Sequence, residues 1–160
     1  YYPDDTIQHA GVVVGLGGVA AHVLCKLPRD AEGYMGRLRC VQEISAVTAA
    51  CMMVKTSVFK AVGGFDEELK VAFNDIDLCM KVRKYGVKIV FTPYAELYHY
   101  ESKSRGMEDT PEKQLRFSRE VNCFRRKWER ELLKGDPYYN PNLTLNNTDC
   151  SLRKQEKNGD

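Results

Sequence analysis

The residues with the clearest chemical capacity form the run Asn74-Asp75-Ile76-Asp77, in which one apolar residue separates two carboxylates. An asparagine followed by acidic residues is typical of a helix start, where free backbone N–H groups and the helix dipole favour negative charge. We therefore expect Asn74 to cap a helix that extends to about residue 85. A carboxylate at the mouth of a cleft, ready to take a proton, has the same residue type, so type alone does not distinguish capping from catalysis.

A second residue with chemical capacity is His99, which follows a predicted strand and a turn. The segment Val87 to Phe91 alternates as a strand does, Thr92-Pro93 bends the chain, and a short extended piece leads into the histidine. An imidazole can act as a metal ligand or as a proton carrier, whereas a histidine in the core or at the surface needs neither role.

Other elements must position these residues. Residues from Ile7 to Val14 and from Ala46 to Val54 are apolar runs of strand length. A short helix from Ser57 to Val62, capped by Thr56, is expected to end at the glycine pair Gly63-Gly64. Between the two strands, Gly15-Leu16-Gly17-Gly18 lacks the lysine and hydroxyl residues of a phosphate-binding loop and predicts an ordinary loop.

A long amphipathic helix is predicted from about residue 111 to residue 133, because Thr110-Pro111-Glu112 is a strong helix start. With the other elements it predicts an α/β domain of three layers, with part of a mixed sheet. The charged face of the helix is usually just solvated, and its alternative role is peripheral contact with anionic lipid or phosphate-bearing acceptors. The cations of this face are Lys113, Arg116, Arg119, Arg126, Lys127 and Arg130.

Composition limits the class of protein. A chain of 160 residues suits one domain or about half of a larger one, and a formal net charge of +2 is too small to predict a nucleic-acid partner. Its six cysteines form no Cys-x-x-Cys pair, so we expect reduced, mostly buried thiols of a cytoplasmic protein. The inner face of the membrane is the alternative location, through the helix described above.

Four segments follow one another along the chain: Ile7-Gln8-His9-Ala10-Gly11, Gly63-Gly64-Phe65-Asp66-Glu67, Asn74-Asp75-Ile76-Asp77-Leu78 and His99-Tyr100-Glu101-Ser102. In this order they resemble the C-terminal half of family-2 glycosyltransferases, bacterial enzymes with the GT-A (nucleotide-diphospho-sugar transferase) fold, above all those that build cell-surface polysaccharides. The resemblance covers the chain to about residue 145 and implies that residues 1–145 are the C-terminal part of a catalytic domain whose N-terminal nucleotide-binding half is absent. We expect residues 146–160 to be a disordered tail.

The resemblance implies a role for each segment. The acidic pair of the family falls on Asn74-Asp75, so Asp75 takes the role of general base toward an acceptor hydroxyl, while Asn74 departs from the commoner glutamate. His99 falls on a histidine that in some members ligates the nucleotide-bound divalent metal, Mn²⁺ or Mg²⁺. The implied substrate-binding residues are Thr48, Ala49, Gly64, Phe65, Asp66, Glu67, Asn74 and Asp77.

The implied function is the acceptor-side portion of an inverting glycosyltransferase, which moves a sugar from a nucleotide-diphosphate donor to a polysaccharide or lipid-linked acceptor. No Asp-x-Asp metal motif precedes residue 45, so we expect the chain alone to have little activity and to hold little metal. One alternative is a non-catalytic dimerisation or sugar-binding module on the same scaffold, and another is a metal hydrolase that uses Asp75, Asp77 and His99. A surface that the absent half would cover favours homo-oligomers.

Overall fold

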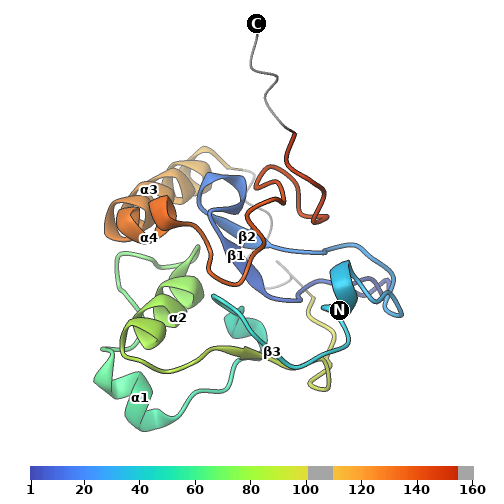
Figure 1. The fold of residues 1–160 in the computed structure, drawn as a ribbon. Coiled ribbons are helices and arrows are strands. Elements are labelled where there is room, and N and C mark those ends of the chain that lie inside the picture. The colour runs from blue at the N-terminus through green and yellow to red at the C-terminus, as the bar shows by residue number, and fades with distance from the viewer. Residues whose placement is uncertain (101–109, 155–160) are drawn as a thin grey trace, which may run out of the picture.

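The computed structural model describes residues 1–100 and 110–154 (Figure 1). Glu101 and Ser102 of the fourth segment, and residues 155–160 of the predicted tail, lie outside the described residues.

An antiparallel hairpin lies at the centre of the molecule (Figure 1). It pairs β1 (Val12–Val14) with β2 (Ala20–His22), and Val13 lies opposite Ala21. The predicted strand from Ile7 is therefore formed only in its last three residues. The glycine-rich loop is the connection of this hairpin and contains the 3-10 turn η1 (Leu16–Gly18), as expected for an ordinary loop.

Both faces of β1 are covered, because successive side chains of a strand point to opposite sides. Val13 packs into one apolar cluster with the C-terminal segment, through Tyr139 and Leu143. Val12 and Val14 pack into the other cluster, against the helices, and this cluster includes Phe124. The hairpin is thus a middle layer between helices and a C-terminal segment, and the chain is mixed α/β with small sheets.

The second sheet is also two-stranded and pairs β3 (Gln42–Glu43) with β4 (Val90–Phe91) in an antiparallel manner. An isolated bridge joins Ala46 to Val12 of the hairpin. The expected strand from Ala46 to Val54 is wrong beyond this bridge, because the chain turns at once into the 3-10 element η3 (Ala49–Cys51). The Thr48 hydroxyl accepts from the Ala50 N–H at 3.3 Å and so satisfies locally a donor that a strand would need for pairing.

The helices agree more closely than the strands with those expected from the sequence. They are α1 (Thr56–Ala61), α2 (Asn74–Lys84), α3 (Pro111–Lys127) and α4 (Glu129–Lys134). The single helix expected from residue 111 to 133 is interrupted at Trp128, whose φ of −114° and ψ of 22° are not helical and whose indole is buried. None of these helices is both long enough and apolar enough to span a bilayer.

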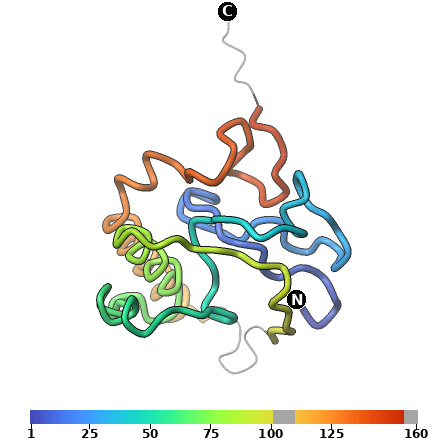
Figure 2. Tube along the Cα trace, turned by 60° about the horizontal axis from the view of Figure 1, so that its bottom comes forward, coloured from blue at the N-terminus to red at the C-terminus, as the bar shows by residue number. Residues whose placement is uncertain are grey.

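Residues 146–154, expected to be disordered, are instead packed against the rest of the chain, beside the loop of residues 24–38 (Figure 2). The Leu24 N–H donates to the Thr148 carbonyl at 2.6 Å, Leu152 bridges to Leu143, and Cys150 is buried. The sequence could not predict this packing, because the segment is mostly polar and is held by one buried thiol and a few backbone hydrogen bonds. The expectation of mostly buried cysteines is also wrong, since only Cys79 and Cys150 are buried.

Candidate functional site

The Asp75 carboxylate is half-buried in the first turn of α2 and is oriented by backbone donors. The Ala49 N–H donates to Asp75 Oδ2 at 3.0 Å, and the Ile76 N–H donates to Asp75 Oδ1 at 2.9 Å. A carboxylate offers about four lone-pair positions, so these two bonds fix its direction and leave acceptor capacity. The group can therefore still accept a proton from a molecule that reaches it.

Backbone strain and aromatic packing fix the start of α2. Phe73, rather than the expected Asn74, is the N-cap, and its φ of 63° and ψ of 4° are left-handed, which costs a bulky residue about 1–2 kcal/mol. Its ring lies 5.8 Å from the ring of Phe117 and 5.3 Å from that of Phe124, both on α3. The packing of the ring offsets the strain, and the candidate base is held at a defined place against α3.

A buried carboxylate, Glu120 of α3, holds the chain just before this helix start. It is only 3% exposed, and its two oxygens accept from the backbone N–H groups of Val71 at 3.1 Å and Ala72 at 2.8 Å. This role could not be predicted from the sequence, because a glutamate on a charged helix predicts a solvated side chain.

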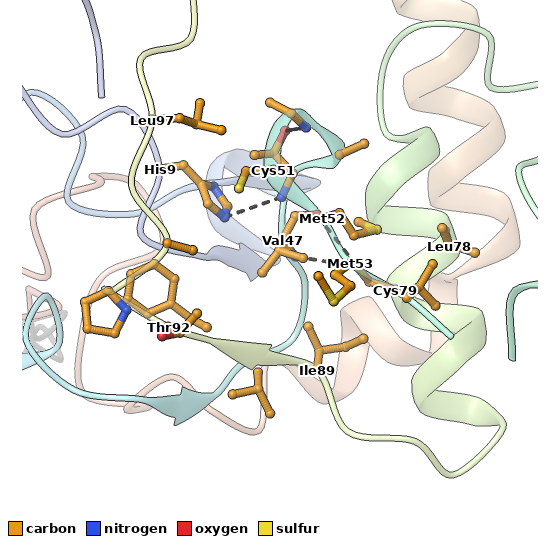
Figure 3. Close-up of a pocket in the computed structure, with 18 of the residues that line it drawn as sticks. His9, Val47, Cys51, Met52, Met53, Leu78, Cys79, Ile89, Thr92 and Leu97 are labelled. Carbon is orange, nitrogen blue, oxygen red and sulfur yellow. Dashed lines mark hydrogen bonds between the residues drawn. The ribbon is translucent and has the colours of Figure 1, made fainter. Parts of the chain in front are cut away.

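A pocket of about 820 Å³ is lined by the candidate residues Thr48, Ala49 and His99. Asp75 is not itself a lining residue, and it accepts a hydrogen bond from the N–H of Ala49. Apolar side chains form most of its wall, and His9 and Cys51 lie among them (Figure 3). The apolar lining includes Val47, Met52, Met53, Leu78 and Ile89.

His99 also lines this pocket, and the buried side chain of Gln8 holds it in place. Its Nδ1 lies 2.9 Å from Gln8 Oε1, and Gln8 Nε2 donates to the His99 carbonyl at 3.2 Å. Only Nε2 of the ring is then available to a metal, and no group of three metal-ligating side chains occurs in residues 1–100 and 110–154. The described residues do not by themselves fit a divalent cation.

His9 is the pocket residue to which the sequence assigned no role, although it stands beside Gln8 in the first resembling segment. Its Nδ1 lies 3.0 Å from Nδ1 of His22, and its Nε2 accepts from the Thr48 N–H at 3.4 Å (Figure 3). Burial, with a smaller contribution from His22, lowers the pKa of His9 to about 3. The ring is therefore neutral at ordinary pH.

Asp77 does not belong to this site. Its side chain is 0% exposed, and its Oδ1 accepts from Trp128 Nε1 at 2.8 Å and from Lys127 Nζ at 2.8 Å, while Oδ2 lies 3.2 Å from Lys81 Nζ. The expectation that Asp77 binds substrate is corrected, because a buried carboxylate surrounded by such partners has no surface left for a ligand.

The loop from Gly64 to Glu67 is joined to the middle of α2 and the end of α3. Lys127 bridges Asp66 to Asp77 and lowers the pKa of Asp66, and Lys81 donates to the Gly64 carbonyl. Phe65 and Glu67 are exposed, yet none of these four loop residues is among the described residues that line the pocket. The candidate residues therefore form two groups, one at the pocket and one around Asp77, with Asn74 half-buried next to Asp75.

Ion pairs within the chain involve three of the cations expected on the charged face of α3. Lys127 is used in the interior network, Arg126 lies 3.8 Å from Glu68, and Arg116 lies 4.0 Å from Glu120. These three cations therefore have acidic partners within the chain.

The chain is similar to parts of much longer known proteins. The chain is 58% identical to uncharacterized protein y4gI of Sinorhizobium fredii, over 95% of the chain and 17% of that protein. It is 38% identical to the O-antigen biosynthesis protein RfbC of Myxococcus xanthus, over 99% of the chain and 12% of that protein. The chain thus spans only a small part of the length of the curated relatives it matches.

A shorter match covers 62 residues, or 39% of the chain. This part is 36% identical to the N-acetylglucosaminyl-diphospho-decaprenol L-rhamnosyltransferase of Mycobacterium tuberculosis, of which it covers 20%. No family model matches the chain, and no solved structure is significantly similar to it.

Proposed function

We propose that this chain is the acceptor-side part of an inverting glycosyltransferase and that Asp75 is its general base. The observation that carries the proposal is the half-buried Asp75 carboxylate, which is bonded to Ala49, a residue that lines a pocket together with Thr48 and His99. Similarity to an O-antigen biosynthesis protein and to a rhamnosyltransferase supports sugar transfer in polysaccharide synthesis as the reaction class. The substrates are then a nucleotide-sugar donor and a saccharide or lipid-linked acceptor.

In this reaction an acceptor hydroxyl donates a hydrogen bond to Asp75 and attacks the anomeric carbon of the donor. The bond from that carbon to the nucleoside diphosphate breaks on the opposite side, so the configuration inverts, and the hydroxyl proton passes to the carboxylate. The N–H groups of Ala49 and Ile76 keep the carboxylate in place during the transfer. Positioned general bases contribute typically about 10²–10⁴-fold to a rate.

The proposal keeps residues 1–145 as part of a GT-A domain whose nucleotide-binding part is supplied by sequence outside this chain. The length of the relatives, of which the chain matches 17% and 12%, supports it. A divalent cation, Mn²⁺ or Mg²⁺, stays in the proposal with Nε2 of His99 as one ligand and the other ligands outside the described residues.

The second candidate is a non-catalytic sugar-binding or dimerisation module on the same scaffold. It is favoured by Asn74 in place of the commoner glutamate and by the lack of a three-ligand metal group in the described part of the chain. A metal hydrolase loses support, because Asp77 is buried among cations and an indole.

The two candidates differ in what the native gene product does with nucleotide sugars. Uridine- and thymidine-diphosphate sugars are supplied with Mn²⁺ and a lipid-linked saccharide acceptor, and release of nucleoside diphosphate is measured. We expect acceptor-dependent release by the gene product and little or none by the 160-residue chain. A gene product that neither binds nor turns over any nucleotide sugar would leave the module as the better description.

A further inference from the structure

A chain of hydrogen bonds leads from β2 to the candidate base. Nδ1 of His22 contacts Nδ1 of His9 at 3.0 Å, and Nε2 of His9 accepts from the Thr48 N–H at 3.4 Å. The next residue, Ala49, donates its N–H to the Asp75 carboxylate at 3.0 Å. Two imidazoles therefore support, from inside the protein, the turn that orients the carboxylate.

The geometry allows one arrangement of protons on these rings. Because the Thr48 N–H is a donor, Nε2 of His9 must be an acceptor, and a neutral His9 then carries its proton on Nδ1. That proton faces His22, whose Nδ1 must be the acceptor. His22 is thus neutral with its proton on Nε2. The opposite assignment would put a proton on Nε2 of His9, directly against the Thr48 N–H.

We propose that His9 and His22 are positioning residues, which hold the Thr48-Ala49 turn in the place where the Ala49 N–H orients the Asp75 carboxylate. The catalytic part of this role rests on the proposed function, whereas the hydrogen-bond chain does not. The two histidines are 13 positions apart in the sequence, and their rings come together because the hairpin pairs Val12 with His22.

Acid should disrupt this series of hydrogen bonds, because the His9–His22 pair has no position for a third proton. On Nδ1 of His22 it would meet the Nδ1 proton of His9, and on Nε2 of His9 it would meet the Thr48 N–H. Protonation therefore costs at least one of the two bonds. Other groups also face the two histidines. The Phe91 ring of β4 packs on the His9 ring, with 6.5 Å between centroids, and the wall of the pocket carries charged groups. Its charged groups are Lys55, Lys88, Glu96 and the amino group of Tyr1, and its other histidine and thiols are His99, Cys51 and Cys79.

The first test reads the protons directly on the folded 160-residue chain labelled with ¹⁵N. Imidazole nitrogen shifts at neutral pH should show His9 protonated on Nδ1 and His22 protonated on Nε2, with assignments made from single His9→Gln and His22→Gln variants. A His9 ring that carries its proton on Nε2 would overturn the proposal. His99, whose ring bonds to Gln8, serves as the internal reference that does not touch the turn.

The second test follows the turn and the base. Glutamine at position 9 retains an acceptor that can reach the Thr48 N–H, whereas leucine has none, so the amide signals of Thr48 and Ala49 should shift in His9→Leu and stay near their original values in His9→Gln. Equal shifts in both variants would contradict the proposal. If His9→Leu does not fold, the nitrogen shifts of the unsubstituted chain still decide.

The third test connects the pair to catalysis in the native gene product. His9→Leu should lower kcat at least tenfold with KM for the donor nearly unchanged, and His9→Gln should recover most of the loss. Unchanged kcat in His9→Leu would refute the positioning role. A gene product without turnover would instead refute the proposed function and leave the nitrogen-shift result intact.

Discussion

Asp75 and Asp77 differ in environment although only one residue separates them. Successive helical residues are rotated by about 100°, so these two carboxylates point about 200° apart and cannot share one site. Asp75 bonds to Ala49, which lines the pocket, and Asp77 is enclosed by Lys81, Lys127 and Trp128. The sequence could have indicated this division from helical spacing alone. It could not have shown which of the two is buried, because the partners of Asp77 on α3 lie 50 residues or more away.

His9 gives the stability of the chain a dependence on pH. Its pKa is about 3 in the folded chain and about 6.5 when exposed, so the unfolded chain binds the proton first as the pH falls. The free energy of unfolding should therefore be fully retained above about pH 6.5 and decrease below it, by up to about 1.4 kcal/mol per pH unit until the folded pKa is reached.

Urea unfolding from about pH 7 to about pH 4 measures this effect. The carboxylates contribute equally to the unsubstituted chain and to His9→Gln, so the difference between the two curves isolates the histidine. We expect the variant to lose less stability on acidification. Parallel curves would mean that the imidazole of His9 is not shielded from protonation.

At the scale of elements, α2 is fixed to α3 at two levels. Glu120 accepts from the backbone just before α2, and Asp77 bonds to Lys127 and Trp128 in the interior. Helix starts were predictable to within a residue, since Thr110-Pro111 and the acids of α2 are local signals, whereas the interruption at Trp128 was not. The strands were not, because two- and three-residue strands depend on partners far along the chain, such as Val90 for Glu43.

Removal of the Glu120 carboxylate should therefore loosen the start of α2. Glu120→Ala leaves the Val71 and Ala72 N–H groups without their acceptors, and each buried unsatisfied donor costs about 1–3 kcal/mol. We expect a loss of about 2–5 kcal/mol in the free energy of unfolding, measured with urea. Glu112→Ala, at the exposed start of the same helix, should lose less than about 1 kcal/mol, and equal losses would contradict this role of Glu120.

At the scale of the whole molecule, the face around the pocket exposes apolar side chains. Met53 is 99% exposed and Val90 is 49% exposed, and both line the pocket. Contiguous exposed apolar surface is typical of an interface with another chain or domain. The proposed function assigns this face to the remainder of the glycosyltransferase domain, and the chain by itself should then associate through it.

Sedimentation velocity tests that association. Met53→Lys and Val90→Lys should shift the 160-residue chain toward monomer, because a charge on an apolar interface opposes burial. Leu133→Lys is the matched control, since Leu133 is also exposed but lies on α4 outside the residues that line the pocket. A monomeric unsubstituted chain, or an equal effect of all three substitutions, would argue against the assignment of this face.

Asp75→Asn in the native gene product shows whether Asp75 takes the proton of the acceptor hydroxyl. The amide nearly preserves the shape, and its oxygen can still accept from the Ala49 N–H, so the substitution removes the basicity at the cost of the bond from the Ile76 N–H. We expect kcat to fall by about 10²–10⁴-fold while the Kd for the nucleotide-sugar donor stays within about threefold. A kcat close to that of the unsubstituted enzyme, at equal donor affinity, would place the base elsewhere.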